Sequence, residues 1–106
     1  MNEWTREQWD SAKNNSTLTL FYIYTPMCGT CQVASKMMNV IKEMVTYPIG
    51  QANINFLRDL AIEQEIESVP CLLITKQGKV VKKIYAFQSV PYLLETIKAI
   101  DEDGNL

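Results

Sequence analysis

Apolar and polar residues follow two patterns along the chain, one typical of helices and the other of strands. Thr5 and Gln8 have the spacing of a capping box, which predicts a short helix that runs to about Lys13. The next segment, Leu18–Tyr24, is rich in aromatic and aliphatic residues and is apolar on both faces. This pattern predicts a central strand that is covered by helices on both sides.

Residues 28–47 carry the strongest helical pattern of the chain. At about 100° per residue, the apolar side chains of this segment share one broad arc and the polar ones fill the opposite arc. The apolar arc comprises Val33, Ala34, Met37, Met38, Val40, Ile41, Met44 and Val45. Pro48 and Gly50 then end the pattern, so the sequence predicts a long amphipathic helix with this arc buried.

The second half of the chain alternates between strand and helix signals. We predict a strand at 52–57, a short charged helix at 59–66, strands at 71–75 and 80–85, a last helix that begins around Ser89 and Pro91, and a solvated tail at 101–106. Gln77-Gly78 is a tight-turn signal between the last two strands, and Lys82 and Lys83 favour an edge position for the second of them. The order of elements predicts an α/β fold with a central mixed sheet of about four strands and helices on both faces.

Length and composition indicate one globular domain over residues 1–106. Hydrophobic residues make up 47% of the chain and charged residues 21%. Ten basic and twelve acidic side chains give a net charge of −2, which argues against nucleic acid or a membrane as the main partner. Histidine is absent, so any catalysis uses other groups. We expect a monomer.

The expected location is the cytoplasm. Residues 1–15 are polar and lack the pattern of a secretory signal, and Leu18–Tyr24 is too short to span a bilayer. The chain has three cysteines, an odd number. That count suits a reducing compartment and one working pair better than a secreted disulfide scaffold.

The sequence Cys28-Gly29-Thr30-Cys31 lies where the buried strand meets the long helix. The start of a helix has free N–H groups and a positive dipole end, and both stabilise a thiolate, the species that attacks disulfides. Cys28 falls in the polar arc and Cys31 at the margin of the apolar arc. We therefore expect Cys28 to attack a substrate disulfide and Cys31 to resolve the mixed disulfide. Gly29 lets a partner's backbone approach.

Two other interpretations of this cysteine pair stay open. The cysteines are either small core residues three positions apart or half of a zinc site, although Cys71 is the one further sulfur and no histidine is available. Cys71 itself is interpreted as a buried strand residue, with a third redox-sensitive thiol as the alternative.

Over nearly its whole length the chain resembles thioredoxin. The segment Tyr22-Ile23-Tyr24-Thr25-Pro26-Met27 leads into the cysteine pair, Val69-Pro70 stands where the family keeps its cis-proline, and Lys76-Gln77-Gly78-Lys79 resembles the family hairpin. The resemblance implies the thioredoxin fold and a thiol–disulfide oxidoreductase of cell redox homeostasis. It implies no cofactor beyond the Cys28–Cys31 disulfide, protein disulfides as substrates, and a reductase or a low-molecular-weight thiol as electron donor.

The resemblance also implies a substrate groove. Pro70 would lie against the cysteine pair, the Val69 backbone would bond an extended substrate segment, and the segment Ile84-Tyr85-Ala86 would form a third wall. The substrate-binding residues implied are Met27, Gly29, Thr30, Val69, Pro70 and Tyr85.

Several positions depart from the usual family pattern. Met27 replaces a tryptophan and Thr30 a proline, while Tyr22 and Gln51 stand at the positions of a buried acid and its lysine partner. Tyr85 replaces a glycine and is expected to narrow the groove, and Gln32 replaces a lysine. The chain is therefore more similar to thioredoxin-like relatives than to thioredoxin itself. The alternative function is a binding module in which the cysteine pair only gates a protein contact.

Overall fold

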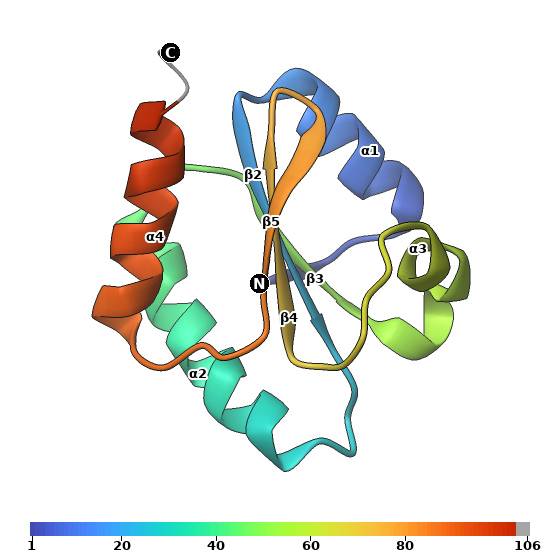
Figure 1. Ribbon diagram of the computed structural model, residues 1–106. Helices are drawn as coiled ribbons and strands as arrows, with labels where there is room; N and C mark the ends of the chain where they lie inside the picture. The colour runs from blue at the N-terminus through green and yellow to red at the C-terminus, as the bar shows by residue number, and fades with distance from the viewer. Residues whose placement is uncertain (104–106) are drawn as a thin grey trace.

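A computed structural model describes residues 1–103 as a central sheet between two layers of helices (Figure 1). The elements are β1 (Asn2–Glu3), α1 (Arg6–Asn15), β2 (Leu18–Tyr24), α2 (Gly29–Met44), β3 (Ile49–Asn53), η1 (Ile54–Phe56), α3 (Arg58–Glu63), β4 (Cys71–Lys76), β5 (Lys79–Ile84) and α4 (Val90–Asp103). In Figure 1, α2 and α4 lie on one side of the sheet, and α1 and α3 lie on the other.

The sheet is mixed, with the strand order β1-β3-β2-β4-β5. β3 pairs in parallel with β1 and β2, whereas β4 pairs antiparallel with β2 and β5. The α/β architecture is confirmed, but the sheet has one strand more than expected. The additional strand, β1, consists of two exposed polar residues, so its sequence has no apolar alternation from which a strand is predicted.

The central strand β2 distributes its side chains between two hydrophobic clusters. Leu20 and Tyr22 face α2 and α4, where they pack with Met38 and Leu93. Phe21 and Ile23 face the other layer, in the cluster that contains Trp9 of α1 and Leu60 of α3. Six of the seven residues of β2 are buried, so the prediction of a strand covered on both faces is confirmed.

The third strand lies earlier in the sequence than predicted. The chain enters β3 at Ile49, directly after Pro48, whose carbonyl oxygen accepts a hydrogen bond from the Leu20 N–H at 3.0 Å. The Asn53 side chain then accepts a bond from the Asn55 N–H at 3.0 Å and caps the short helix η1. The strand predicted at 52–57 is therefore wrong in position, because an asparagine cap converts its second half into a 3₁₀ turn.

Helix α2 is buried through a narrower arc than predicted, and it ends at Met44 rather than at residue 47. Its fully buried residues are Cys31, Ala34, Met38 and Ile41. Val33, Val40 and Met44, which the helical pattern places in the apolar arc, have 56%, 47% and 56% of their surface exposed. The sheet covers only the middle of the apolar arc of α2, so the residues at the edge of that arc stay exposed.

The hairpin of β4 and β5 and the last helix agree with the elements predicted from the sequence, except at the end of the chain. Gln77 and Gly78 have φ angles of 52° and 83°, as a tight two-residue hairpin requires, and β5 with its lysines is an edge strand. Helix α4 continues to Asp103, so 101–103 are helical, while 104–106 of the predicted tail lie outside the described residues. Within residues 1–103, no helix has the length and apolar character needed to cross a membrane.

Candidate functional site

Cys28 is the N-cap residue of α2, so the helix begins at Gly29, one position later than predicted. Its Sγ accepts a hydrogen bond from the Cys31 N–H at 3.1 Å and lies 3.2 Å from the Thr30 Oγ1. The Cys28 side chain is half-buried, whereas Cys31 is only 2% exposed. The predicted difference in exposure between the two sulfurs is confirmed.

The surroundings of the two sulfurs move their pKa values in opposite directions. Hydrogen bonds from the Cys31 and Thr30 side chains lower the pKa of Cys28 below that of an ordinary thiol. Burial, followed by the contact with Cys28, raises the pKa of Cys31 to about 11. As the pH rises, Cys28 therefore loses its proton first, while Cys31 keeps its proton at neutral pH.

Tyr22 and Gln51 are paired across β2 and β3, and the resemblance implies an acid and a lysine at these positions. The Tyr22 hydroxyl is buried, and burial raises the pKa of Tyr22 to about 12. The Gln51 amide donates a hydrogen bond to Glu3 Oε2 of β1. The site therefore has a neutral phenol and a neutral amide in place of a buried ion pair.

An apolar groove of about 490 Å³ lies beside the cysteine pair. It is lined by Thr30, Val33, Ala34, Met37, Val69, Pro70, Tyr85, Ala86, Phe87 and Gln88. The Val69–Pro70 peptide bond is cis, and the Val69 carbonyl oxygen lies 3.9 Å from the Cys28 Sγ. Four of the implied substrate-binding residues, Thr30, Val69, Pro70 and Tyr85, thus meet at one groove.

Met27 and Gly29, the other two residues that the resemblance implies bind substrate, lie at the outer side of the cysteine pair. Met27 has 96% of its surface exposed and precedes Cys28 in the loop between β2 and α2. Gly29 is the first residue of α2, and a Cβ atom built on it meets nothing within 4 Å among the described residues. Internal packing therefore does not require a glycine here, and this side is open to a partner.

Tyr85 lines the groove, but its position is set by the opposite layer of the molecule. Its ring packs against the cluster that contains Cys71 and Leu73, and its hydroxyl oxygen accepts a hydrogen bond from the Glu67 N–H at 3.2 Å. Tyr85 therefore joins the end of β5 to the loop that precedes Val69. The sequence reveals the tyrosine, but not this contact.

Cys71 is the first residue of β4 and has no exposed surface. Burial raises the pKa of Cys71 to about 12, so the interpretation as a buried strand residue is confirmed. Within residues 1–103, no group of three or more cysteine or acidic side chains is placed to hold a metal ion.

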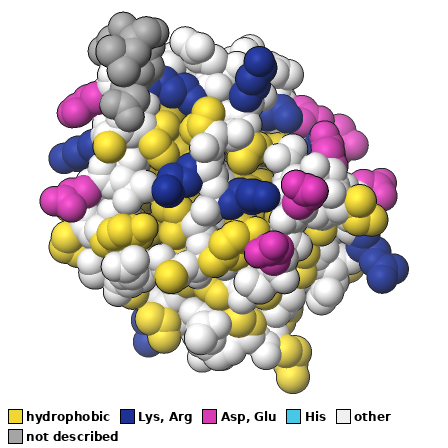
Figure 2. Space-filling model, in the orientation of Figure 1, with side chains coloured by type: hydrophobic (Ala, Val, Ile, Leu, Met, Phe, Trp, Pro, Cys, Tyr) yellow, Lys and Arg dark blue, Asp and Glu magenta, His cyan; other side chains and the backbone are white. Residues whose placement is uncertain are grey.

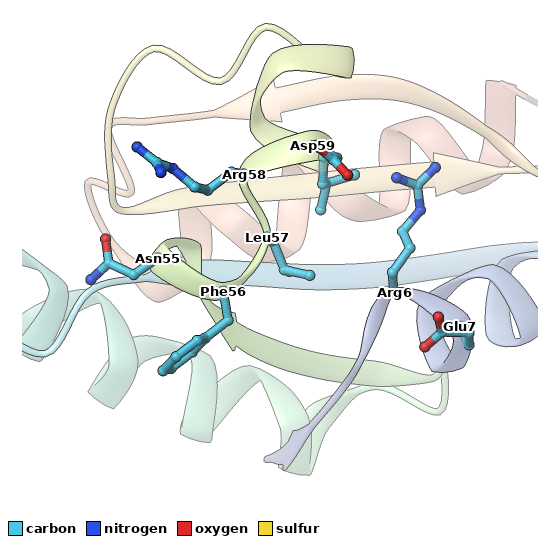
Figure 3. A pocket seen from close by; sticks show the side chains of 8 residues that line it. Arg6, Glu7, Asn55, Phe56, Leu57, Arg58 and Asp59 are labelled. Carbon is cyan, nitrogen blue, oxygen red and sulfur yellow. The ribbon is translucent and has the colours of Figure 1, made fainter.

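A second hollow, of about 440 Å³, lies between the start of α1 and the segment from η1 to α3 (Figure 3). Arg6 and Glu7 line one side of it, and Phe56, which is 83% exposed, lies on the other. Arg6 is paired with Glu63 at 2.7 Å and with Asp10 at 3.3 Å. The cysteine pair does not line this hollow, which was not predicted from the sequence.

The surface carries charges of both signs, in keeping with the small net charge. Figure 2 shows basic and acidic side chains intermixed over one face, with hydrophobic side chains between them.

Some residues that line the groove beside the cysteine pair are not among the substrate-binding residues predicted from the sequence, namely Val33, Met37, Phe87 and Gln88. The exposed part of the apolar arc of α2 is the signal that could have indicated Val33 and Met37.

A cysteine pair at the start of a helix, beside the central strand of a mixed five-stranded sheet, defines a thioredoxin-fold protein. The family model described as Thioredoxin matches residues 1–99, and the chain therefore belongs to the thioredoxin family. The thioredoxin-like protein YusE of Bacillus subtilis is 54% identical to it over 80 residues, which cover 74% of this chain and 76% of that protein. Thioredoxin-1 of Saccharomyces cerevisiae is 30% identical over 83 residues, covering 76% of this chain and 79% of that protein.

Solved structures show the same fold. A mutant thioredoxin from Halobacterium salinarum superposes with a TM-score of 0.85 at 18% identity, covering 93% of this chain and 88% of that one. Oxidised mitochondrial thioredoxin 3 of Saccharomyces cerevisiae gives a TM-score of 0.79 at 19% identity, with coverage of 93% and 94%. At these identities the likeness concerns the fold alone.

Proposed function

We propose that this protein is a thiol–disulfide oxidoreductase that reduces or exchanges protein disulfides, with Cys28 as the nucleophile and Cys31 as the resolving thiol. One observation carries the proposal. The half-exposed Cys28 Sγ caps α2 and accepts the Cys31 N–H at 3.1 Å, and Cys31 lies buried behind it. A sulfur in this position is stabilised as a thiolate and accessible to a partner.

The reaction proceeds in two exchanges. The Cys28 thiolate attacks one sulfur of a substrate disulfide, forms a mixed disulfide and releases the other substrate sulfur as a thiolate. Cys31 then loses its proton and attacks Cys28, which forms the Cys28–Cys31 disulfide. This step breaks the bond to the substrate, and the substrate leaves as a second thiolate that takes up a proton. The substrate gains two electrons, and the cysteine pair loses them.

The groove supports an extended peptide segment as the part of the substrate that is bound. Its lining is largely apolar, and the Val69 carbonyl oxygen lies beside the reacting sulfur. Met27 and Gly29 border the open side of the cysteine pair. A reductase or a low-molecular-weight thiol restores the dithiol, so the protein carries electrons from that donor to protein disulfides. We assign this activity to the cytoplasm, where thiols are kept reduced.

Single cysteine variants test the two roles. Cys28→Ser is expected to abolish reduction of a protein disulfide, because the attacking sulfur is lost. Cys31→Ser is expected to accumulate mixed disulfides with partner proteins, because resolution is blocked. Non-reducing gels of cell extracts measure the trapped species, and a coupled assay with a reductase, repeated with small thiols, measures turnover.

Cys71→Ser serves as the matched control, because it removes the third thiol without changing the pair. Equal trapping by Cys28→Ser and Cys31→Ser would contradict the assignment of roles. A natural protein that binds partners but turns over no disulfide with either donor would instead indicate a binding module.

A further inference from the structure

The hydroxyl of Tyr22 lies at the first turn of α2, directly beneath the resolving cysteine. It donates a hydrogen bond to the Cys31 carbonyl oxygen at 2.8 Å and lies 2.9 Å from the Ser35 Oγ. The Tyr22 side chain has no exposed surface, and its ring packs edge-on against Phe87 with a centroid distance of 5.8 Å. This phenol is therefore fixed in place, and water does not supply its hydrogen bonds.

The hydrogen bonds of this group allow the phenol proton to change partners. A phenol has one proton to donate, and its oxygen also accepts. The Ser35 hydroxyl is placed to donate to that oxygen, and the Cys31 carbonyl lies within α2, where helical N–H groups bond such carbonyls. The Cys31 carbonyl therefore does not depend on the phenol, and the proton of Tyr22 is available for a stronger acceptor nearby.

Such an acceptor arises when Cys31 ionises. The Tyr22 hydroxyl is held at the backbone of this same residue by its bond to the Cys31 carbonyl oxygen. From there it lowers the pKa of the Cys31 thiol, against the larger effect of burial. The other groups that act most on this thiol are Cys28 and the Thr25 backbone. Tyr24 stacks on Tyr22 at 5.8 Å, and its own hydroxyl donates to Glu3, away from the sulfur.

We propose that Tyr22 is a neutral hydrogen-bond donor to the Cys31 thiolate during resolution of the mixed disulfide, and that Ser35 orients its hydroxyl. The proposal rests on the oxidoreductase function proposed above. In this step Cys31 gives its proton to solvent and its thiolate forms the bond to Cys28. The substrate sulfur leaves and takes up a proton from solvent. Tyr22 keeps its own proton throughout, so it stabilises charge and does not act as a base.

The state of the phenol supports a donor role. Burial raises the pKa of Tyr22 to about 12, so the hydroxyl stays protonated at neutral pH. A protonated phenol cannot accept the proton of Cys31, but it can donate to the anion that remains. A hydrogen bond to a charged group is about twice as strong as one between neutral groups, so the contact strengthens as the thiolate forms.

The test compares Tyr22→Phe with Tyr24→Phe, two variants that each remove one hydroxyl from the same strand. Stopped-flow decay of a preformed mixed disulfide is followed against pH. We expect Tyr22→Phe to slow decay about tenfold at neutral pH and to move the rising limb of the pH profile about one unit higher. Tyr24→Phe is expected to leave the profile unchanged, and Ser35→Ala to move it in the same direction as Tyr22→Phe, but less.

A second readout does not depend on turnover. In a Cys28→Ser background, alkylation of Cys31 against pH reports its ionisation, and adding Tyr22→Phe is expected to shift that curve to higher pH. An unshifted curve, or an equal shift with Tyr24→Phe, would overturn the donor role even if the natural protein is an active oxidoreductase. Inactivity of the natural protein would instead refute the proposed function. If Tyr22→Phe fails to fold, the donor role is tested by the shift that Ser35→Ala causes in the pH profile of mixed-disulfide decay, and an unchanged profile would overturn it.

Discussion

Two buried thiols of this protein, Cys31 and Cys71, have different surroundings although neither is appreciably exposed. Cys31 is in the first turn of α2, in contact with Cys28 and with the Tyr22 hydroxyl. Cys71 begins β4 inside a cluster of apolar side chains that includes Trp9 and Phe21. Burial is the largest cause of the raised pKa in both, which reaches about 11 for Cys31 and about 12 for Cys71.

The comparison shows that burial alone does not determine whether a thiol takes part in chemistry. Both sulfurs are held in the protonated form by their lack of water. Each thiol has a tyrosine side chain whose hydrogen bonding lowers its pKa, Tyr22 for Cys31 and Tyr85 for Cys71, but only Cys31 has a reactive sulfur beside it. What separates the two thiols is therefore the second sulfur, since Cys31 has Cys28 within its own helical turn as a partner for exchange.

The largest expected effect is a difference in labelling between Cys28 and Cys71. Because the pKa of Cys28 is lowered, its rate of alkylation should level off at a lower pH than that of an ordinary exposed thiol. The rate for Cys71, whose pKa is about 12, should still rise with pH above that point. At neutral pH we expect at least a hundredfold difference, measured by peptide mass spectrometry. Comparable labelling of the two residues in the folded protein would contradict the comparison.

A second prediction concerns the redox potential of the pair. The Thr30 hydroxyl lies 3.2 Å from the Cys28 Sγ and lowers the Cys28 pKa, so it stabilises the reduced form. Thr30→Pro removes this hydroxyl, and we expect a stronger reductant. A tenfold change in the equilibrium constant corresponds to about 30 mV for a two-electron couple. The measurement is a titration against glutathione.

Thr30→Val separates the hydroxyl from the rigid ring of proline, since it removes only the hydrogen bond. It is expected to move the potential in the same direction as Thr30→Pro. A potential that is unchanged or less negative in Thr30→Pro would show that Thr30 does not set the balance between the two redox states.

The smallest expected effect is that of Cys71→Ala. This change removes one buried sulfur from the cluster on the α1 and α3 side and is expected to lower the free energy of unfolding by about 1 kcal/mol. The rate of disulfide reduction should stay within about twofold of the natural protein, because Cys71 is not in the proposed reaction. Urea unfolding and the coupled assay measure both quantities. Loss of activity in a folded Cys71→Ala variant would give this thiol a redox role.

The parts of the structure that are predictable from sequence are those with strong local patterns. The apolar strand Leu18–Tyr24, the hairpin at Gln77-Gly78 and the cysteine pair at a helix start all carry their signal within a few residues. β1 was not predictable, because its polar residues form a strand only where β3 offers backbone partners from far along the chain. Its existence depends on tertiary structure rather than on its own sequence.

The candidate site also has features that can be predicted from local sequence and features that cannot. The exposure of Cys28 and the burial of Cys31 follow from their places on a helical wheel, and the structure agrees. The bond from Tyr22 to the Cys31 carbonyl joins two elements, and no periodicity in the sequence reports such a contact. Likewise, the helical wheel of α2 gives its apolar arc but not how much of that arc the sheet covers, which is why Val33 was misplaced.

The position of β2 in the sheet has a consequence for synthesis on the ribosome. β2 forms hydrogen bonds with β3 and β4, and both of these strands follow it in the sequence. This apolar strand therefore leaves the exit tunnel before either partner strand does, and its pairing with β4 must wait until Cys71–Lys76 has also emerged. During that interval an unpaired apolar strand favours aggregation. The amphipathic helix α2, which follows β2 directly, is the first element available to cover one of its faces.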